Sequence, residues 1–153
     1  AFDTVALGLV VRKNCELKAK IVAEDERERG RRVLLNLGHT FGHALESLGG
    51  YRQLLHGEAV SIGIALAART SAQLGLLDDS DCDRIEALLT RAHLPVSASD
   101  IDVDQLLERM HMDKKASAKG LNLVLLQRIG EGIVTPSPGD ALLRNIIETQ
   151  LAT

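Results

Sequence analysis

Aromatic side chains are scarce in this chain of 153 residues: they make up 2% of the sequence, and tryptophan is absent. The core must therefore be built from Leu, Ile, Val and Ala, which favours closely packed helices. Hydrophobic residues contribute 45% and charged residues 25%, the balance of a folded protein and not of a disordered one. We find no internal repeat or domain boundary and expect a single helical domain over residues 1–153.

Other common features are missing as well. The net charge of −3 gives no electrostatic reason to expect nucleic acid or a membrane surface as a partner. Cys15 and Cys82 are too far apart for metal-type spacing, which predicts free thiols in a reducing, cytoplasmic compartment. No apolar run is long enough to cross a bilayer, and no signal peptide precedes the first helical pattern. Because the chain begins at Ala1 and not at Met, we expect a piece excised from a longer protein, although N-terminal processing gives the same first residue.

The hydrophobic pattern predicts a mainly α fold with one small β-hairpin. Helices are expected over residues 3–23, 33–48 and 56–76, around 85–92 and 103–110, and from Ser137-Pro138 to Leu151. The hairpin should join residues 121–126 to residues 133–134. The charged run 25–32 is expected to be a solvated connection, and Gly49-Gly50 to stop the second helix. Gly38 and Gly42 lie four residues apart, which indicates that another segment approaches that helix closely.

Three of the five histidines, His39, His43 and His56, lie in one short window. On a helix, the rings of His39 and His43 project from one face and can serve one site. Imidazole is the commonest protein ligand for zinc-like metals and is suited to proton transfer near neutral pH. The residues alone predict a metal site with these three rings as candidate ligands, oriented by Glu46 and Glu58. The alternative is three ordinary helix residues with satisfied ring nitrogens.

Side chains able to bind an anion surround this window. Arg can clamp a carboxylate or phosphate with two parallel hydrogen bonds, and Lys supplies a point charge. Each basic residue taken alone is more commonly a solvated surface charge. The candidates are Lys18, Lys20, Arg31, Arg32, Asn36, Lys114 and Lys115.

Several stretches of the sequence resemble one enzyme family, in the same order along the chain. They are 16–22 (ELKAKIV), 25–28 (DERE), 32–46 (RVLLNLGHTFGHALE), 56–60 (HGEAV), 112–115 (MDKK) and 123–126 (LVLL). These stretches resemble the C-terminal, metal- and substrate-binding domain of 3-dehydroquinate synthase. The resemblance implies the multi-helical fold of that domain, and it does not extend to the family's N-terminal nucleotide-binding domain.

The resemblance implies a lyase of the shikimate pathway, which leads to the aromatic amino acids. Such an enzyme converts 3-deoxy-D-arabino-heptulosonate 7-phosphate to 3-dehydroquinate and phosphate, using NAD and a divalent metal, zinc or cobalt. A substrate hydroxyl is oxidised transiently, phosphate is eliminated, the ketone is reduced, and the ring opens and closes by an aldol step. The full-length enzyme is expected to be a cytoplasmic homodimer, and the fragment alone is expected to be inactive.

Roles for individual residues follow from the same resemblance. It implies that His39 and His56 are metal ligands, with a Glu from a preceding segment as the third. His43 and Glu28 match catalytic positions with acid–base character. The positions that match substrate-binding residues are Lys18, Arg32, Asn36 and either Lys114 or Lys115, of which we favour Lys114. Residues that bind the NAD are expected mostly in the N-terminal domain.

Two other hypotheses stay open. Another sugar-phosphate cyclase, such as 2-deoxy-scyllo-inosose synthase, has the same fold; His43 beside Glu28 and Asn36 is our reason to prefer 3-dehydroquinate synthase. The second alternative is that the chain is a non-catalytic helical module that binds partners. Such a module would have no reason to gather three histidines.

Overall fold

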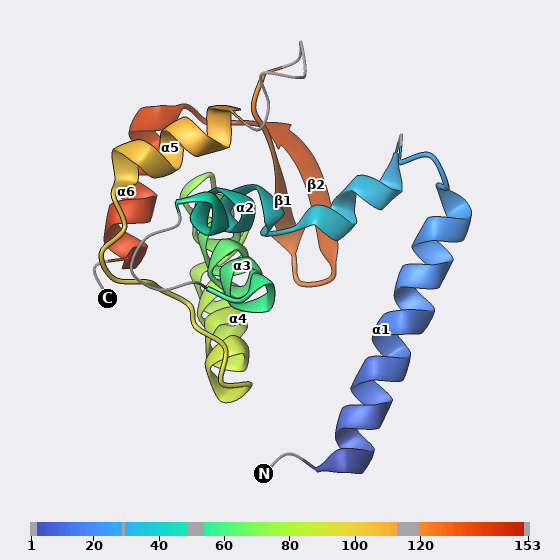
Figure 1. Cartoon of the computed structure of the whole chain (residues 1–153). Coiled ribbons are helices and arrows are strands. Elements are labelled where there is room, and N and C mark those ends of the chain that lie inside the picture. Colours follow the sequence, from blue (N-terminus) through green and yellow to red (C-terminus); the bar gives the residue numbers. More distant parts are fainter. Residues whose placement is uncertain (1–2, 29, 49–53, 113–119, 152–153) are drawn as a thin grey trace. The chain divides into compact units, whose positions relative to one another are not determined.

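Helices dominate the structure, which confirms the expected fold class (Figure 1). The computed structural model describes residues 3–28, 30–48, 54–112 and 120–151. The chain forms two compact units, Ala1–Leu35 and Asn36–Thr153. The elements, in order, are α1 (Thr4–Glu24), the 3-10 helix η1 (Arg31–Asn36), α2 (His39–Ser47), α3 (His56–Gln73), α4 (Asp79–Arg91), α5 (Val103–Met112), β1 (Asn122–Arg128), β2 (Glu131–Pro136) and α6 (Asp140–Leu151). None of the helices in these ranges combines the length and apolar character needed to span a membrane.

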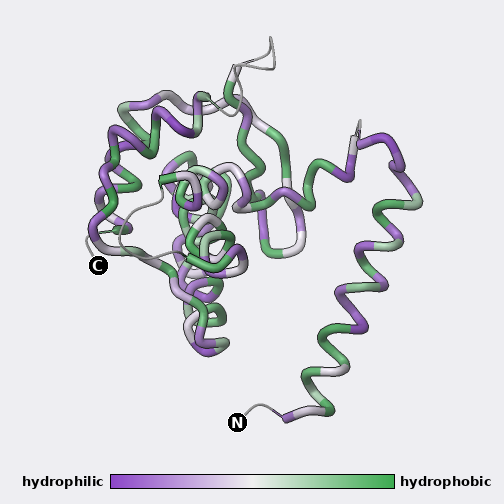
Figure 2. The backbone as a smooth tube through the Cα atoms, viewed as in Figure 1, coloured by the Kyte–Doolittle hydropathy of each residue, from purple (hydrophilic) through white to green (hydrophobic). Residues whose placement is uncertain are grey.

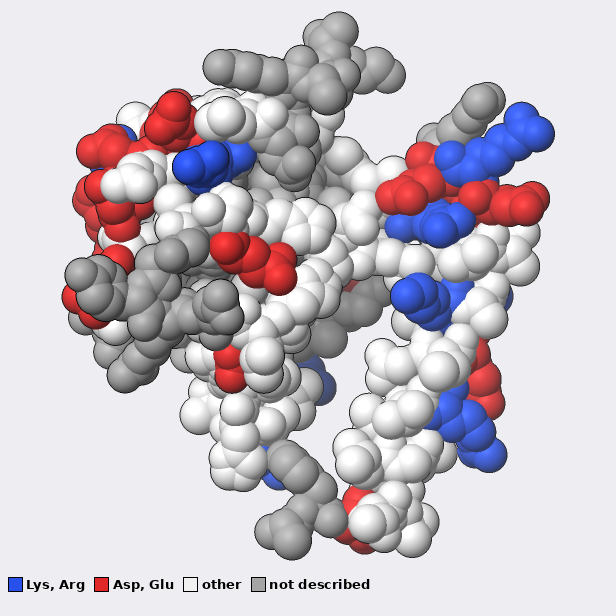
Figure 3. Space-filling model, in the orientation of Figure 1, with Lys and Arg blue, Asp and Glu red and all other residues white. Residues whose placement is uncertain are grey.

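The first unit contains α1, the charged turn that follows it and most of η1. Asp3 caps α1, since its Oδ1 accepts hydrogen bonds from the backbone N–H groups of Val5 (2.8 Å) and Ala6 (3.3 Å). Figure 2 shows polar and apolar residues alternating along α1. At the turn, Asp25 Oδ2 accepts from the N–H groups of Gly30 (2.8 Å) and Arg32 (3.0 Å). Charges of both signs gather there (Figure 3), so the run expected to be a solvated connection is an organised, exposed turn.

The single helix expected over residues 33–48 is wrong: η1 and α2 replace it. The break is at Gly38, whose φ of +79° is a left-handed conformation that a side chain disfavours. A Cβ at Gly38 would also lie 2.7 Å from the backbone nitrogen of Ile64 on α3. The expected stop at Gly49-Gly50 lies outside the described residues, and α2 ends at Ser47.

The core of the second unit surrounds α3, which buries ten of its residues. The close approach predicted from the glycines is confirmed, because backbone atoms of α3 lie directly beside Gly38 and Gly42. A Cβ at Gly42 would lie 3.2 Å from the backbone of Ala59, and one at Gly63 only 2.0 Å from the carbonyl oxygen of Gly38. The largest fully buried side chains are Phe41, Ile62, Leu66, Leu106, Met110, Leu123, Leu125, Leu143 and Ile147.

The predicted hairpin is present as two antiparallel strands, with Val124 of β1 opposite Val134 of β2. A buried hydroxyl joins the hairpin to α3: Ser71 Oγ donates to the Ala67 carbonyl (2.7 Å) and accepts the N–H of Leu126 (2.9 Å). The hairpin therefore completes one side of the core around α3.

The last helix starts later than expected. Ser137 and Pro138 do not open it; α6 begins at Asp140, after Gly139 adopts a left-handed φ of +99°. The Ser137 hydroxyl instead accepts the N–H of Gly139 (3.4 Å) within the preceding turn. Beyond this start, the expected apolar residues Leu143, Ile146 and Ile147 are buried as predicted.

Both cysteines are free thiols, Cys15 exposed and Cys82 fully buried. Burial raises the pKa of the Cys82 thiol to about 11. Because the thiolate is the reactive form, we expect a disulfide reagent at about pH 8 to label one thiol per native chain and both after denaturation. Cys15→Ser should then abolish native labelling, and rapid labelling of that variant would contradict the buried position of Cys82.

Candidate metal centre

The three imidazoles singled out by the sequence lie together. His39 begins α2, His43 follows one helical turn later, and His56 begins α3. The ring centroids are 5.5 Å apart for His39 and His43, 5.6 Å for His39 and His56, and 6.0 Å for His43 and His56. The tight α2–α3 crossing brings the two helices close enough for this cluster to form.

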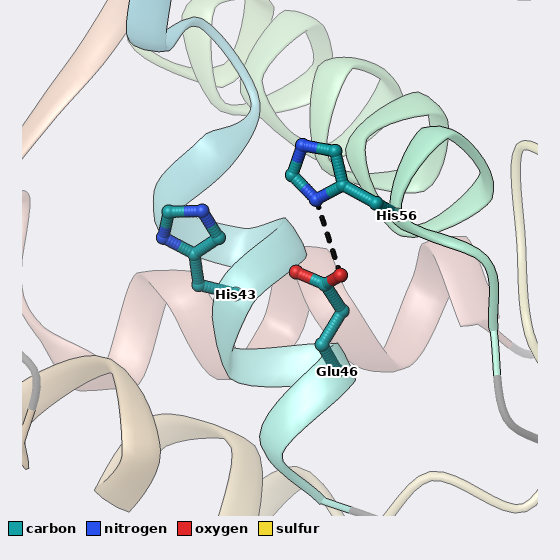
Figure 4. Close-up of side chains that lie close together, drawn as sticks. All are labelled: His43, Glu46 and His56. Carbon is teal, nitrogen blue, oxygen red and sulfur yellow. Dashed lines mark hydrogen bonds and ion pairs between the residues drawn. The ribbon is translucent and has the colours of Figure 1, made fainter.

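The His56 ring has a carboxylate as a hydrogen-bond partner. His56 Nδ1 lies 3.1 Å from Oε1 of Glu46 on α2 (Figure 4). An ionised carboxylate only accepts hydrogen bonds, so Nδ1 must carry the proton. In the neutral ring, Nε2 then has a free lone pair, which is the form that binds a metal.

The His39 ring has a backbone carbonyl as its hydrogen-bond partner. Its Nδ1 lies 3.1 Å from the carbonyl oxygen of Leu37. A carbonyl is also only an acceptor, so Nδ1 of His39 carries the proton and Nε2 is free. This carbonyl is available because the chain turns sharply at Gly38 and does not continue as one helix.

The His43 ring differs from the other two. It is exposed, and within the described ranges no hydrogen bond to either of its nitrogens is found. Its tautomer is therefore not imposed by a hydrogen-bond partner among the described residues.

The cluster suits a divalent metal. Among the residues that the structure describes, His43, Glu46 and His56 form a group whose ligand atoms all lie within 4.8 Å of one another (Figure 4). Ligand atoms about 2.1 Å from a tetrahedral zinc ion lie about 3.4 Å apart. The side chains would therefore have to move closer together by roughly 1 Å to bind such an ion. With His39 beside them, imidazole nitrogens predominate, a donor set that favours zinc and similar transition metals.

Glu58, the other carboxylate expected to orient a histidine, has a different partner. Its Oε2 accepts the backbone N–H of Leu55 (2.9 Å), which caps the start of α3. Of the two expected carboxylates, Glu46 contacts an imidazole and Glu58 stabilises the helix end from which His56 projects.

The candidates of the first unit lie on α1, the charged turn and η1. Lys18 is exposed on α1. Glu28 has a left-handed φ of +52°, and its Oε2 lies 3.9 Å from Arg32 Nε. Arg32 also donates from Nη1 to the Glu26 carbonyl (2.8 Å), so both charged candidates belong to one organised turn. Arg31 pairs instead with Glu24 at 3.0 Å.

Asn36 ends η1 and is partly buried. Lys114 and Lys115 lie outside the described residues. Two groups that sequence reasoning did not find are the Leu37 carbonyl, which fixes His39, and Asp25, which organises the turn carrying Glu28 and Arg32. A backbone carbonyl leaves no signal in a sequence. Asp25 is one of several charged residues in the run 25–32, and nothing in the sequence distinguishes it from the others.

A family model matches most of this chain. The model described as 3-dehydroquinate synthase C-terminal matches residues 1–116. That range includes the three histidines, the charged turn and both candidate lysines near its end.

Solved structures of two sugar-phosphate cyclases share the fold. A 2-epi-5-epi-valiolone synthase from Streptomyces hygroscopicus, with NAD+ and Zn2+ bound, is 23% identical, with a TM-score of 0.82 over 93% of this chain and 39% of its own. A 2-deoxy-scyllo-inosose synthase complexed with carbaglucose-6-phosphate, NAD+ and Co2+ is 23% identical, with a TM-score of 0.83 over 99% of this chain and 43% of its own. This chain thus spans less than half the length of either protein.

Proposed function

Because this chain belongs to the family of 3-dehydroquinate synthase C-terminal domains, we propose that it is the metal- and substrate-binding domain of a 3-dehydroquinate synthase. The complete protein would convert 3-deoxy-D-arabino-heptulosonate 7-phosphate to 3-dehydroquinate and phosphate. Its cofactors would be NAD and a divalent metal. The two similar solved structures contain NAD+ with Zn2+ and NAD+ with Co2+.

One observation carries the proposal: His39 and His56 start neighbouring helices with Nδ1 bonded to an acceptor and Nε2 free. Histidine ligands in metal sites usually have this arrangement. We propose these two rings as metal ligands, with a glutamate from a preceding segment as the third. A metal bound there would supply Lewis acidity toward a substrate oxygen, while NAD takes up and returns a hydride.

His43 and Glu28 are our candidates for proton transfer. The His43 ring is near His39, with 5.5 Å between centroids, and is exposed, which supports a group that exchanges protons with a ligand. The Glu28 side chain is 43% exposed, and its carboxylate forms an ion pair with the Arg32 guanidinium. We assign it the second acid–base role by its motif.

Lys18, Arg32, Asn36 and Lys114 are the proposed contacts to the anionic groups of the substrate. The exposed Lys18 ammonium and the Arg32 guanidinium supply the charge that a phosphate and a carboxylate require. One Arg32 nitrogen is held by the Glu26 carbonyl, so the side chain keeps further N–H groups for a ligand.

Phosphate release by the complete protein, loaded with NAD and Zn2+ or Co2+, tests the function. We expect turnover of 3-deoxy-D-arabino-heptulosonate 7-phosphate at a kcat/KM at least about 100-fold above that of glucose 6-phosphate, which lacks the carboxylate. The opposite preference would make the protein a cyclase of the 2-deoxy-scyllo-inosose type. Absence of both turnover and metal binding would favour the non-catalytic module.

We further propose that the complete enzyme is a cytoplasmic homodimer, as the family resemblance implies. The two free thiols agree with a reducing compartment.

A further inference from the structure

We propose that Glu46 is a positioning residue that holds the His56 imidazole in its metal-binding tautomer and orientation. The inference rests on the proposed function, because it assumes that His56 is a metal ligand. It assigns a separate task to the one described carboxylate that contacts the histidine cluster through a hydrogen bond.

Glu46 is the contact that restrains an otherwise loosely held ring. The His56 side chain is 61% exposed, so packing alone does not fix its rotamer, whereas the Glu46 side chain is 30% exposed. The bond of 3.1 Å runs from the start of α3 to α2, between residues ten positions apart. Removing it would leave the ring free to rotate, and a metal would then have to bind a ring that is not already oriented.

The geometry favours orientation over direct metal binding by Glu46. The two nitrogens of an imidazole face different directions, and the Glu46 carboxylate is bonded at Nδ1. In Figure 4 the other ring nitrogen of His56 lies on the side away from Glu46. A metal on Nε2 would therefore lie across the ring from this carboxylate, although the ligand atoms of His43, Glu46 and His56 lie within 4.8 Å of one another.

Metal affinity of Glu46 variants tests the inference without measuring turnover. Zn2+ and Co2+ are titrated into the complete protein against a chromophoric chelator, and the Co2+ absorption spectrum is recorded. Glu46→Gln keeps an oxygen acceptor, and we expect roughly 10-fold weaker binding; Glu46→Ala removes it, and we expect about 100-fold weaker binding. The Co2+ spectrum at saturation should stay that of the unmodified protein in both variants.

Glu108→Gln is the matched control, since Glu108 is an exposed carboxylate on α5 with no described hydrogen bond to the three histidines, and it should leave the affinity unchanged. Thermal unfolding of each metal-free variant separates a folding defect from lost positioning, and the Gln variant is the one expected to fold normally. Affinities of both Glu46 variants within twofold of the control would overturn the inference. So would loss of binding in Glu46→Gln as complete as in His56→Ala with a changed Co2+ spectrum, because Glu46 would then be a ligand. If the unmodified protein binds neither metal, the proposed function fails together with the inference.

Discussion

His39→Ala is expected to abolish tight metal binding, whereas His43→Ala should keep the metal and lose turnover. In the proposed site, His39 contributes Nε2 directly, with its other nitrogen held by the Leu37 carbonyl. Removing the hydrogen-bond partner of a metal ligand typically lowers metal affinity by about 10- to 100-fold. Removing the ligand itself should therefore lower the affinity by more than about 100-fold. Removing a general acid–base group such as His43 should lower kcat by about 100- to 10,000-fold.

Metal analysis of the two purified variants, with single-turnover phosphate release, checks the assignment. The reverse pattern, with metal lost in His43→Ala and kept in His39→Ala, would identify His43, Glu46 and His56 as the ligand set, since their ligand atoms lie within 4.8 Å of one another. His93→Ala is the control, because His93 lies after α4, outside the cluster, and its loss should change neither quantity.

Gly63→Ala is expected to have the largest effect on stability. The added Cβ would lie 2.0 Å from the Gly38 carbonyl oxygen and 3.0 Å from the Gly42 nitrogen, both backbone atoms that cannot rotate away. The α2 and α3 helices would have to separate, and we expect the free energy of unfolding to fall by about 3 kcal/mol or more. Denaturant unfolding followed by circular dichroism measures this change.

Gly57→Ala provides the comparison on the same helix. Nothing lies within 4 Å of the Cβ it would add, so this substitution should be neutral or stabilise α3 by up to about 1 kcal/mol. If Gly63→Ala proved as stable as Gly57→Ala, the α2–α3 crossing would tolerate a side chain, contrary to this expectation. Because the crossing also sets the spacing of the imidazoles, Gly63→Ala should weaken metal binding as well.

The helices and the hairpin were predictable because their signals are local. Apolar residues at helical spacing predicted α3 to α6, and the run at 121–126 predicted β1. The same reasoning failed at Gly38 and Ser137, where a left-handed glycine and the packing around it decide where a helix begins. A helical pattern in sequence does not reveal that a neighbouring helix packs so closely that an added Cβ would lie within 3 Å of its backbone.

The sequence by itself determined which chemical groups the protein has and which family it resembles: three imidazoles, two on one helix face, with a charged turn before them. The tertiary structure alone decided how those groups are arranged. It placed His56 beside His39 and His43. It also paired Glu46 with the His56 imidazole, Glu58 with the start of α3, and the Leu37 carbonyl with His39. The physical reason is that spacing along a chain fixes neighbours within one helix, whereas contacts between helices depend on how closely their backbones pack, which here depends on glycines.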